Sequence, residues 1–245
     1  MTPEARLRAA LDALPARVTL WWRDDDAGRN HPRLASLLAL AEARDLPLAL
    51  AVVPDWLEPA CAKRILASSR ATVLQHGIAH RDHAIAPARK IELGGGADGG
   101  RLREELAHGR ERLAATFGDR FRSVLVPPWN RIAPDLLPGL PSLGFAGLST
   151  WGPRPSPQPV PGLRQVNTHL DLVAWREGGR ARELGELAQA LAGLVGTQRG
   201  EPIGVLSHHL VMDPAALATL DRLWALVQDH PQVRLAGVGT LFGEG

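Results

Sequence analysis

Apolar residues follow two patterns along the chain, and each pattern predicts one type of element. Short runs rich in β-branched and aromatic residues predict strands, whereas an apolar residue at every third or fourth position predicts amphipathic helices. The expected strands are residues 18–22, 48–53, 71–74, 123–126, 145–149, 163–168, 203–207 and 233–235. The expected helices are residues 2–14, 32–44, 56–68, 101–117, 133–139, 181–195 and 213–229.

Two stretches follow neither pattern. Residues 81–100 end in the glycine-rich run 94–100, whose composition is typical of a surface loop. Residues 152–162 contain five prolines. We interpret this second stretch as an insertion and not as a domain linker, because the alternation of helices and strands resumes after it.

The order of the elements predicts the fold. Strands that alternate with helices indicate parallel βαβ units. Seven or eight such units in 245 residues fit an α/β structure, a (β/α) barrel that forms one domain over residues 1–245. An open doubly wound sheet is the alternative. The dinucleotide-binding form of that sheet is disfavoured, because no G-x-G-x-x-G sequence follows the first predicted strand.

Composition excludes several classes of function. The 28 basic and 26 acidic residues nearly balance, and aromatic residues are scarce, with no Tyr and four Phe, which argues against nucleic-acid binding. Cys61 is the only cysteine, so neither an intrachain disulfide nor a thiolate zinc cluster can form. No apolar run approaches the ~18 residues of a membrane span, and the first residues lack the pattern of a signal peptide. We therefore expect a cytoplasmic protein without nucleic-acid or membrane partners.

Unusual polar clusters follow five of the predicted strands. The clusters are residues 23–26, His76 with His80, residues 127–130, residues 169–171 with Trp175, and residues 207–209. The carboxyl ends of barrel strands meet at one face, where barrel enzymes place their chemistry. The sequence therefore predicts one functional site at that face.

His76 and His80 are the first candidate metal ligands. A spacing of four residues places two rings on one side of a helical turn, which suits two nitrogen ligands of one metal. A carboxylate from residues 24–26 would complete a two-histidine, one-carboxylate site, which holds Zn for hydrolysis or Fe(II) for oxygenation. Three successive carboxylates repel one another unless a cation lies among them. A solvated turn or a helix cap is the alternative interpretation of these acids.

His208 and His209 are candidates for proton transfer near neutral pH. The two residues are adjacent on a predicted strand, so their side chains point to opposite faces. Only one of them can therefore face the site.

Together these segments resemble the motifs of the polysaccharide deacetylase family (NodB homology, carbohydrate esterase family 4). That family carries T-F-D-D-G, H-S-x-x-H, R-P-P-Y-G, D-x-x-D-W and L-x-L-x-H on a distorted (β/α) barrel. The similar segments here are an Asp pair within residues 24–26, H-G-I-A-H at 76–80, P-P-W-N at 127–130, D-L-V-A-W at 171–175 and L-S-H at 206–208. They occur in the same order, and the resemblance covers about residues 18–210.

The resemblance implies a role for each matching residue. Asp26, His76 and His80 are the implied metal ligands, and Asp25 is the implied catalytic base. The alternative register makes Asp24 the base and Asp25 the ligand. The implied general acid is His208, and Trp129 is the implied donor of a backbone N–H to the oxyanion. The positions implied to line or support the substrate site are Leu206 at the acetyl-methyl pocket, Asp171, Trp175 and Asn130.

Three positions depart from the family motifs. Val126 stands where the family has the arginine that orients the base, Asn130 stands where it has a glycine, and Ala174 stands where it has a second aspartate. Arg131 or Arg23 could replace the arginine.

The activity implied by the resemblance is metal-dependent hydrolysis, with Zn as the expected divalent cofactor. Water activated by the metal would remove an N-acetyl or O-acetyl group from a carbohydrate or a sugar conjugate. The same residues also fit a C–N hydrolase that acts on a small amide or cyclic imide. Because the motif arginine is missing, a non-catalytic sugar-binding domain of the same fold is a further alternative.

Overall fold

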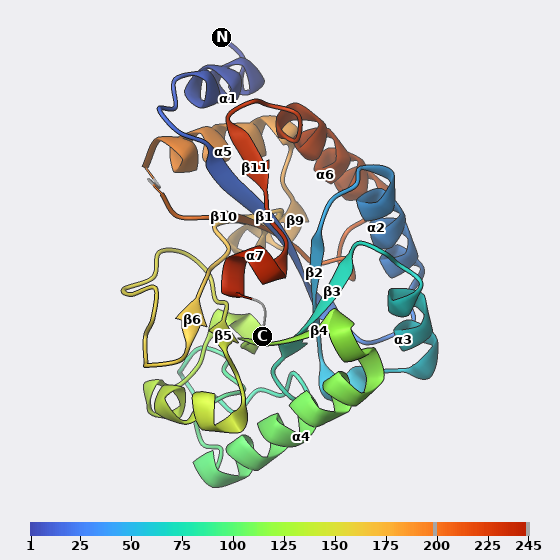
Figure 1. The fold of residues 1–245 in the computed structure, drawn as a ribbon, viewed down its shortest axis with the longest axis vertical. Coiled ribbons are helices and arrows are strands. Elements are labelled where there is room, and N and C mark those ends of the chain that lie inside the picture. Colours follow the sequence, from blue (N-terminus) through green and yellow to red (C-terminus); the bar gives the residue numbers. More distant parts are fainter. Residues whose placement is uncertain (198–199, 244–245) are drawn as a thin grey trace.

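The computed structural model describes residues 1–197 and 200–243, and a parallel β-sheet of nine strands forms its centre (Figure 1). The order of the main strands in this sheet is β6-β5-β4-β3-β2-β1-β10-β7, and β11 pairs with β1. The strands of the sheet are β1 Val18–Ala27, β2 Leu48–Val52, β3 Ala71–His76, β4 Phe121–Val126, β5 Gly147–Leu148, β6 Arg164–Gln165, β7 Leu170–Asp171, β10 Ile203–Ser207 and β11 Val233–Leu235. A separate antiparallel pair is formed by β8 Val173–Ala174 and β9 Arg180–Ala181.

The sheet closes into a barrel through one extended segment, residues 164–171. Its start, β6, pairs with β5, and its end, β7, pairs with β10 on the other side. Between the two strands, the N–H of Thr168 donates to the carbonyl of Thr150 at 3.0 Å, and the N–H of His169 donates to Gly204 at 2.7 Å. This one segment therefore bridges both ends of the curled sheet. The predicted (β/α) barrel is confirmed.

Helices cover the outside of the barrel, mostly between consecutive strands (Figure 1). They are α1 Pro3–Asp12, α2 Pro32–Ala43, α3 Pro59–Leu66, α4 Gly99–Phe117, α5 Leu184–Thr197, α6 Pro214–Val227 and α7 Val238–Phe242. Short 3-10 helices lie at η1 Pro54–Trp56, η2 Gly118–Arg120, η3 Pro128–Asn130, η4 Pro134–Gly139, η5 Pro141–Leu143 and η6 Trp175–Glu177. Side chains of Thr2 and Asp213 cap α1 and α6 by accepting hydrogen bonds from backbone N–H groups.

Several predicted elements differ from the structure, and the strands expected at 145–149 and 163–168 shorten to β5 and β6. The helix expected at 56–68 is interrupted, because a new helix begins at Pro59, a residue that suits a first turn. The helix expected at 133–139 is a 3-10 helix with Pro138 inside it. The first strand continues to Ala27, five residues beyond its expected end, so the polar cluster 23–26 belongs to the strand itself.

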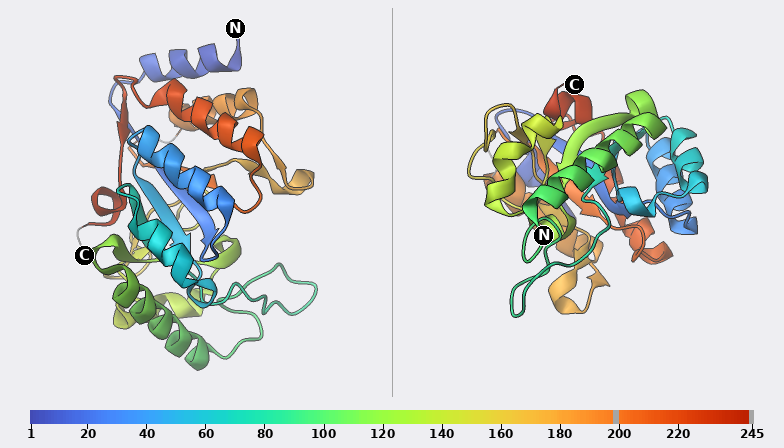
Figure 2. Two further views of the ribbon diagram at one scale, coloured as in Figure 1. Left: turned by 90° about the vertical axis from the view of Figure 1, so that its right-hand side faces the viewer. Right: turned by 90° about the horizontal axis from the view of Figure 1, so that it is seen from below.

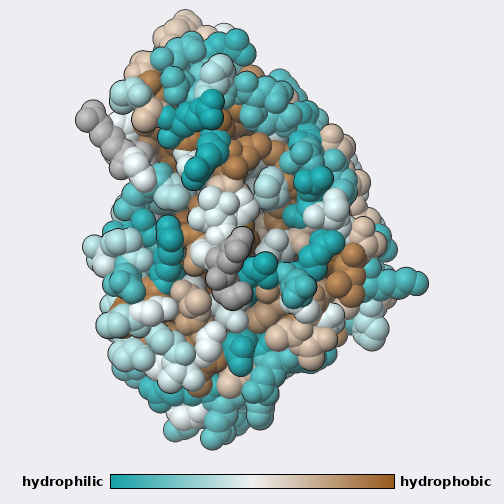
Figure 3. Space-filling view, in the orientation of Figure 1, coloured by the Kyte–Doolittle hydropathy of each residue, from teal (hydrophilic) through white to brown (hydrophobic). Residues whose placement is uncertain are grey.

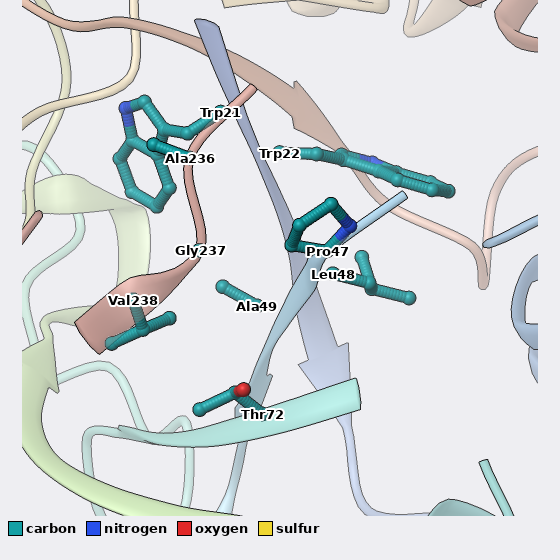
Figure 4. A pocket seen from close by; sticks show the side chains of 9 residues that line it. All are labelled: Trp21, Trp22, Pro47, Leu48, Ala49, Thr72, Ala236, Gly237 and Val238. Carbon is teal, nitrogen blue, oxygen red and sulfur yellow. The ribbon is translucent and has the colours of Figure 1, made fainter. Parts of the chain in front are cut away.

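Apolar side chains pack on both sides of the curled sheet, inside the barrel and outside it. Strand residues such as Trp21, Leu74 and Val126 form the interior cluster, and α7 closes the base of the barrel with Val238 and Leu241. Outside the strands, one cluster involves α1, α2, α3, α5 and α6, and a second packs the outer faces of β4 and β5 against α4 and the 3-10 helices η4 and η5. Figure 4 shows the cavity that remains at the base, and its volume of about 10 Å³ leaves room for no more than one water.

The two ends of the barrel therefore differ. In the left view of Figure 2, the blue-green segment 81–98 and the orange segment 172–183 protrude on the side to which the parallel strands point, whereas α7 lies on the opposite side. Figure 3 views the molecule from the α7 side, where hydrophobic residues occupy the middle of a largely hydrophilic face. Within residues 1–197 and 200–243, no helix is long and apolar enough to cross a membrane.

Candidate metal centre and active site

Strand β1 sends its four polar residues in different directions. Side chains alternate along a strand, so Arg23 and Asp25 share the interior side with Trp21, and Asp24 points outward. At Asp26 the φ angle is +69°, and the pairing of β1 with β2 shifts register between Asp24 and Ala27. Aspartate tolerates this left-handed conformation better than most residues. The irregularity turns Asp26 toward the end of the barrel.

His76 and His80 are brought together by a turn and not by a helix. His76 is the last residue of β3, and the chain then reverses through Gly77 at φ +57° and His80 at φ +56°. The expectation of a helical turn is wrong here. At Gly77 any Cβ would lie 2.0 Å from an oxygen of Glu92, so glycine lets the chain turn at the strand end.

Buried Glu92 holds this turn in place. Its carboxylate accepts hydrogen bonds from the backbone N–H groups of Ile78, Ala79 and Arg81 at 3.0, 2.8 and 2.9 Å. The glutamate comes from the segment 81–98, which follows the turn directly. Sequence reasoning missed Glu92, because nothing in its local pattern distinguishes it from a loop acid.

The three expected metal ligands converge. Asp26 Oδ1 lies 3.2 Å from Nε2 of His76 and 3.2 Å from Nε2 of His80, and all three atoms lie within 4.8 Å of one another. Zinc bonds of about 2.0–2.1 Å imply separations of about 3.3 Å between ligands of a tetrahedral site. Two imidazoles and one carboxylate leave further positions open, so the donor set fits Zn or a similar divalent ion.

The hydrogen bonds around His76 prepare it for this role. Its Nδ1 lies 2.9 Å from the backbone carbonyl of Val126, so the N–H is at Nδ1 and Nε2 keeps its lone pair for a metal. Without a metal, burial alone would lower the pKa of His76, but the carboxylates of Asp25 and Asp26 raise it. Burial alone would raise the pKa of Asp26, but hydrogen bonds from His76 and His80 hold it well below its usual range.

Asp25 lies beside this group and is held by Arg23. Nε and Nη2 of Arg23 donate to the two oxygens of Asp25 at 2.8 and 2.9 Å, and both residues are buried. Arg23 also donates to Ser149 Oγ and to Asn130 Oδ1, each at 2.7 Å. The side chain of Asn130 is thus turned toward the arginine.

Of the two arginines that the sequence offers in place of the missing motif arginine, only Arg23 contacts Asp25. Arg131 donates instead to the carbonyl of Lys90 at 2.8 Å. Val126 belongs to the apolar interior of the barrel. The contact between Asp25 and an arginine is therefore made within β1.

Asp24 lies on the other side of the β1 strand, away from the metal ligands. Its carboxylate accepts hydrogen bonds from Ser207 Oγ at 2.6 Å and from the backbone N–H of His209 at 3.0 Å, and it pairs with the ring of His209. Only the register of Asp25 with Asp26 therefore places both carboxylates at the expected site.

His208 lies beside two other expected site residues, Trp175 and Asp171. The ring of His208 meets that of Trp175 edge to face at 5.0 Å, and its Nδ1 lies 3.8 Å from Asp171 Oδ1. Asp171 accepts a hydrogen bond from Nε1 of Trp175 at 2.9 Å. Burial raises the pKa of Asp171, and the charge of His208 opposes this shift. Leu206 is fully buried on β10, where it pairs with Asp171 and with Arg23 of β1.

Two tryptophans flank His80. The ring centroid of His80 lies 4.4 Å from that of Trp129 and 5.4 Å from that of Trp56. Trp129 has a φ angle of +54°, in the short helix that follows β4. Trp56 was missed at the sequence level, although its place just after a predicted strand could have indicated it.

Comparisons with known proteins find similarity only at the level of structure. No family model matches the sequence, and no curated protein matches it significantly. A protein from Mycobacterium smegmatis, provisionally assigned as a polysaccharide deacetylase, is 17% identical with a TM-score of 0.67, over 93% of this chain and 90% of its own.

Two further similar structures differ in what they do. A family 4 acetyl xylan esterase from Clostridium thermocellum, in complex with a cobalt ion, is 15% identical with a TM-score of 0.59, over 91% of this chain and 90% of its own. A family 4 pseudoenzyme from Bacillus anthracis is 13% identical with a TM-score of 0.60, over 94% of this chain and 66% of its own. With parallel strands that curl into a barrel and a polar site at their carboxyl ends, this chain has the fold of the carbohydrate esterase family 4 deacetylases.

Proposed function

We propose that this protein is a divergent family 4 carbohydrate esterase, a metal-dependent hydrolase that removes an N-acetyl or O-acetyl group from a carbohydrate or sugar conjugate. The observation that carries the proposal is the convergence of Asp26, His76 and His80, with the buried pair of Asp25 and Arg23 beside them. Strands near both ends of the chain build this site, so we treat residues 1–245 as one catalytic domain.

A divalent cation, with Zn as the expected ion, would be held by Asp26, His76 and His80. When bound, it supplies Lewis acidity, which makes water a better nucleophile near neutral pH and polarises the acyl carbonyl.

The other residues handle protons and orientation. Asp25 accepts the proton of the attacking water, and the two hydrogen bonds from Arg23 fix the direction of its carboxylate. His208, across the site, donates a proton to the leaving nitrogen or oxygen. The backbone N–H of Trp129 would stabilise the oxyanion, a role that typically contributes about 3 kcal/mol. Leu206 would wall the pocket of the acetyl methyl group, and Asp171 with Trp175 would support the ring of His208.

Metal analysis followed by an acetate-release screen tests the proposal. We expect one Zn per chain in the loaded protein, loss of that metal in His76→Ala, and acetate release from an acetylated oligosaccharide by the loaded protein only. Small amides and cyclic imides belong in the same screen. Oligosaccharide binding without acetate release would indicate a non-catalytic domain, and turnover of amides alone would replace the carbohydrate substrate.

A further inference from the structure

The residues on either side of His208 are tied to one carboxylate. Asp24 binds the hydroxyl of Ser207, and it binds both the backbone N–H and the ring of His209. All three of these residues are buried, with at most 1% of each exposed. We call Asp24, Ser207 and His209 the clamp.

The clamp follows from the pairing of two strands. Asp24 of β1 lies opposite Ser207, the last residue of β10, in the parallel register. Its side chain points out of the barrel, on the side opposite Asp25. Nε1 of Trp22 also donates to Ser207 Oγ at 2.9 Å, which fixes the hydroxyl from the same strand. The carboxylate therefore ties the end of β10 to β1 just where the chain leaves the sheet.

The polar atoms of the His208 ring do little to fix its orientation. Its Nδ1 is buried without a hydrogen-bond partner among the described residues, and the nearest carboxylate oxygen, on Asp171, is 3.8 Å away. The contact of its ring with Trp175 is apolar. The direction of this ring thus depends on the backbone at 207–209, which the clamp fixes on both sides.

We propose that Asp24 is a positioning residue for His208. It acts through Ser207 and His209, and it holds the His208 ring where the leaving group departs. The proposal deepens the proposed function and depends on it for the role of His208. It also explains why three adjacent aspartates are present when the metal and the base require two.

The kinetic test uses the dependence on the leaving group, because a good leaving group needs little help from a general acid. In the Zn-loaded full-length protein, Asp24→Asn should lower kcat on an N-acetylglucosamine pentasaccharide by about 10- to 100-fold, since a small misplacement of a catalytic group has costs of this size. On p-nitrophenyl acetate the loss should be less than about 3-fold. His208→Gln should show the same selectivity. Equal losses on both substrates, or no loss on either, would overturn the proposal.

Two controls separate positioning from stability. Val205→Ala, in the outer core on β10, should destabilise the protein without any selectivity between the two substrates. His209→Gln keeps a side-chain N–H donor and should retain more pentasaccharide activity than His209→Leu. If Asp24→Asn does not fold, Ser207→Ala with His209→Leu removes the clamp from its other side.

A second measurement needs no turnover. The ring current of Trp175 shifts the His208 ring protons, and that NMR signal is identified by its absence in His208→Gln. In Asp24→Asn the shift should collapse toward the value in Trp175→Ala, while Val205→Ala leaves it in place. An unchanged shift in Asp24→Asn refutes the clamp even in a protein that releases no acetate, whereas a collapsed shift without acetate release refutes only the proposed function.

Discussion

At the residue scale, the main feature of this protein is that four consecutive polar residues of β1 lie in three different surroundings. Arg23 and Asp25 pair inside the barrel, Asp24 binds residues outside it, and Asp26 meets His76 at the mouth. Strand alternation accounts for the first three, and the positive φ of Asp26 accounts for the fourth. Their roles should therefore separate in single substitutions.

The first prediction concerns Asp25 and Asp26. Asp25→Asn should keep the bound Zn and lower kcat by about 10²- to 10⁴-fold, because it removes the proposed base. Asp26→Asn should lose the metal, since it removes a ligand. Metal content by mass spectrometry and acetate release measure the two effects. Retention of one Zn by Asp26→Asn would show that the assignment of these two carboxylates is wrong.

The second prediction concerns Arg23. Lysine keeps the charge but not the two-pronged hydrogen bonding, so Arg23→Lys should lower kcat by about 10-fold or more with little change in KM. Val126 faces the same interior from β4, so Arg23→Gln with Val126→Arg offers a guanidinium from another strand. We expect this double variant to be more active than Arg23→Gln alone. Steady-state kinetics measure the activities of the single and the double variant. Equal activities would count against the proposal that Arg23 acts through Asp25.

At the element scale, the segment 81–98 stabilises the turn that carries His80. Its residue Glu92 is buried and binds three backbone N–H groups of that turn. The turn has left-handed backbone at both ends, which needs such support. The position of His80, a proposed metal ligand, thus depends on an acid outside the proposed ligand set.

The third prediction follows from this support. Glu92→Gln should weaken Zn binding by about 10-fold or more, the usual range for residues that orient metal ligands. Titration with a competing chelator measures the affinity. Glu104→Gln is the matched control, because Glu104 lies exposed on α4. If both variants bind Zn as the wild type does, the turn does not need Glu92.

At the scale of the whole molecule, the segment 164–171 closes the barrel, and His169 is buried in it. Its Nδ1 accepts a hydrogen bond from the N–H of Gly204 at 3.3 Å, an arrangement that requires the neutral ring. Burial lowers the pKa of His169 to about 4. The unfolded chain therefore binds a proton that the folded barrel does not bind between about pH 6.5 and 4.

The fourth prediction is a pH dependence of stability. Because the unfolded chain takes up this proton at a higher pH than the folded chain does, the unfolding free energy should fall as pH drops from about 6.5 to 4, by up to about 3 kcal/mol from this residue. His169→Asn keeps an acceptor but cannot take up the proton. Urea unfolding across this pH range should show a smaller decline for the variant than for the wild type. Parallel declines would mean that His169 is protonated in the folded state.

The sequence by itself determined the alternation of strands and helices, the barrel, and the polar clusters that meet at one of its ends. These features are encoded locally, since hydrophobic period and turn residues act over a few positions. The tertiary structure alone decided which aspartate faces the histidines, that a turn and not a helix brings His76 to His80, and that Arg23 holds Asp25. Each of these depends on strand pairing, register shifts and contacts between distant segments, which no local pattern specifies.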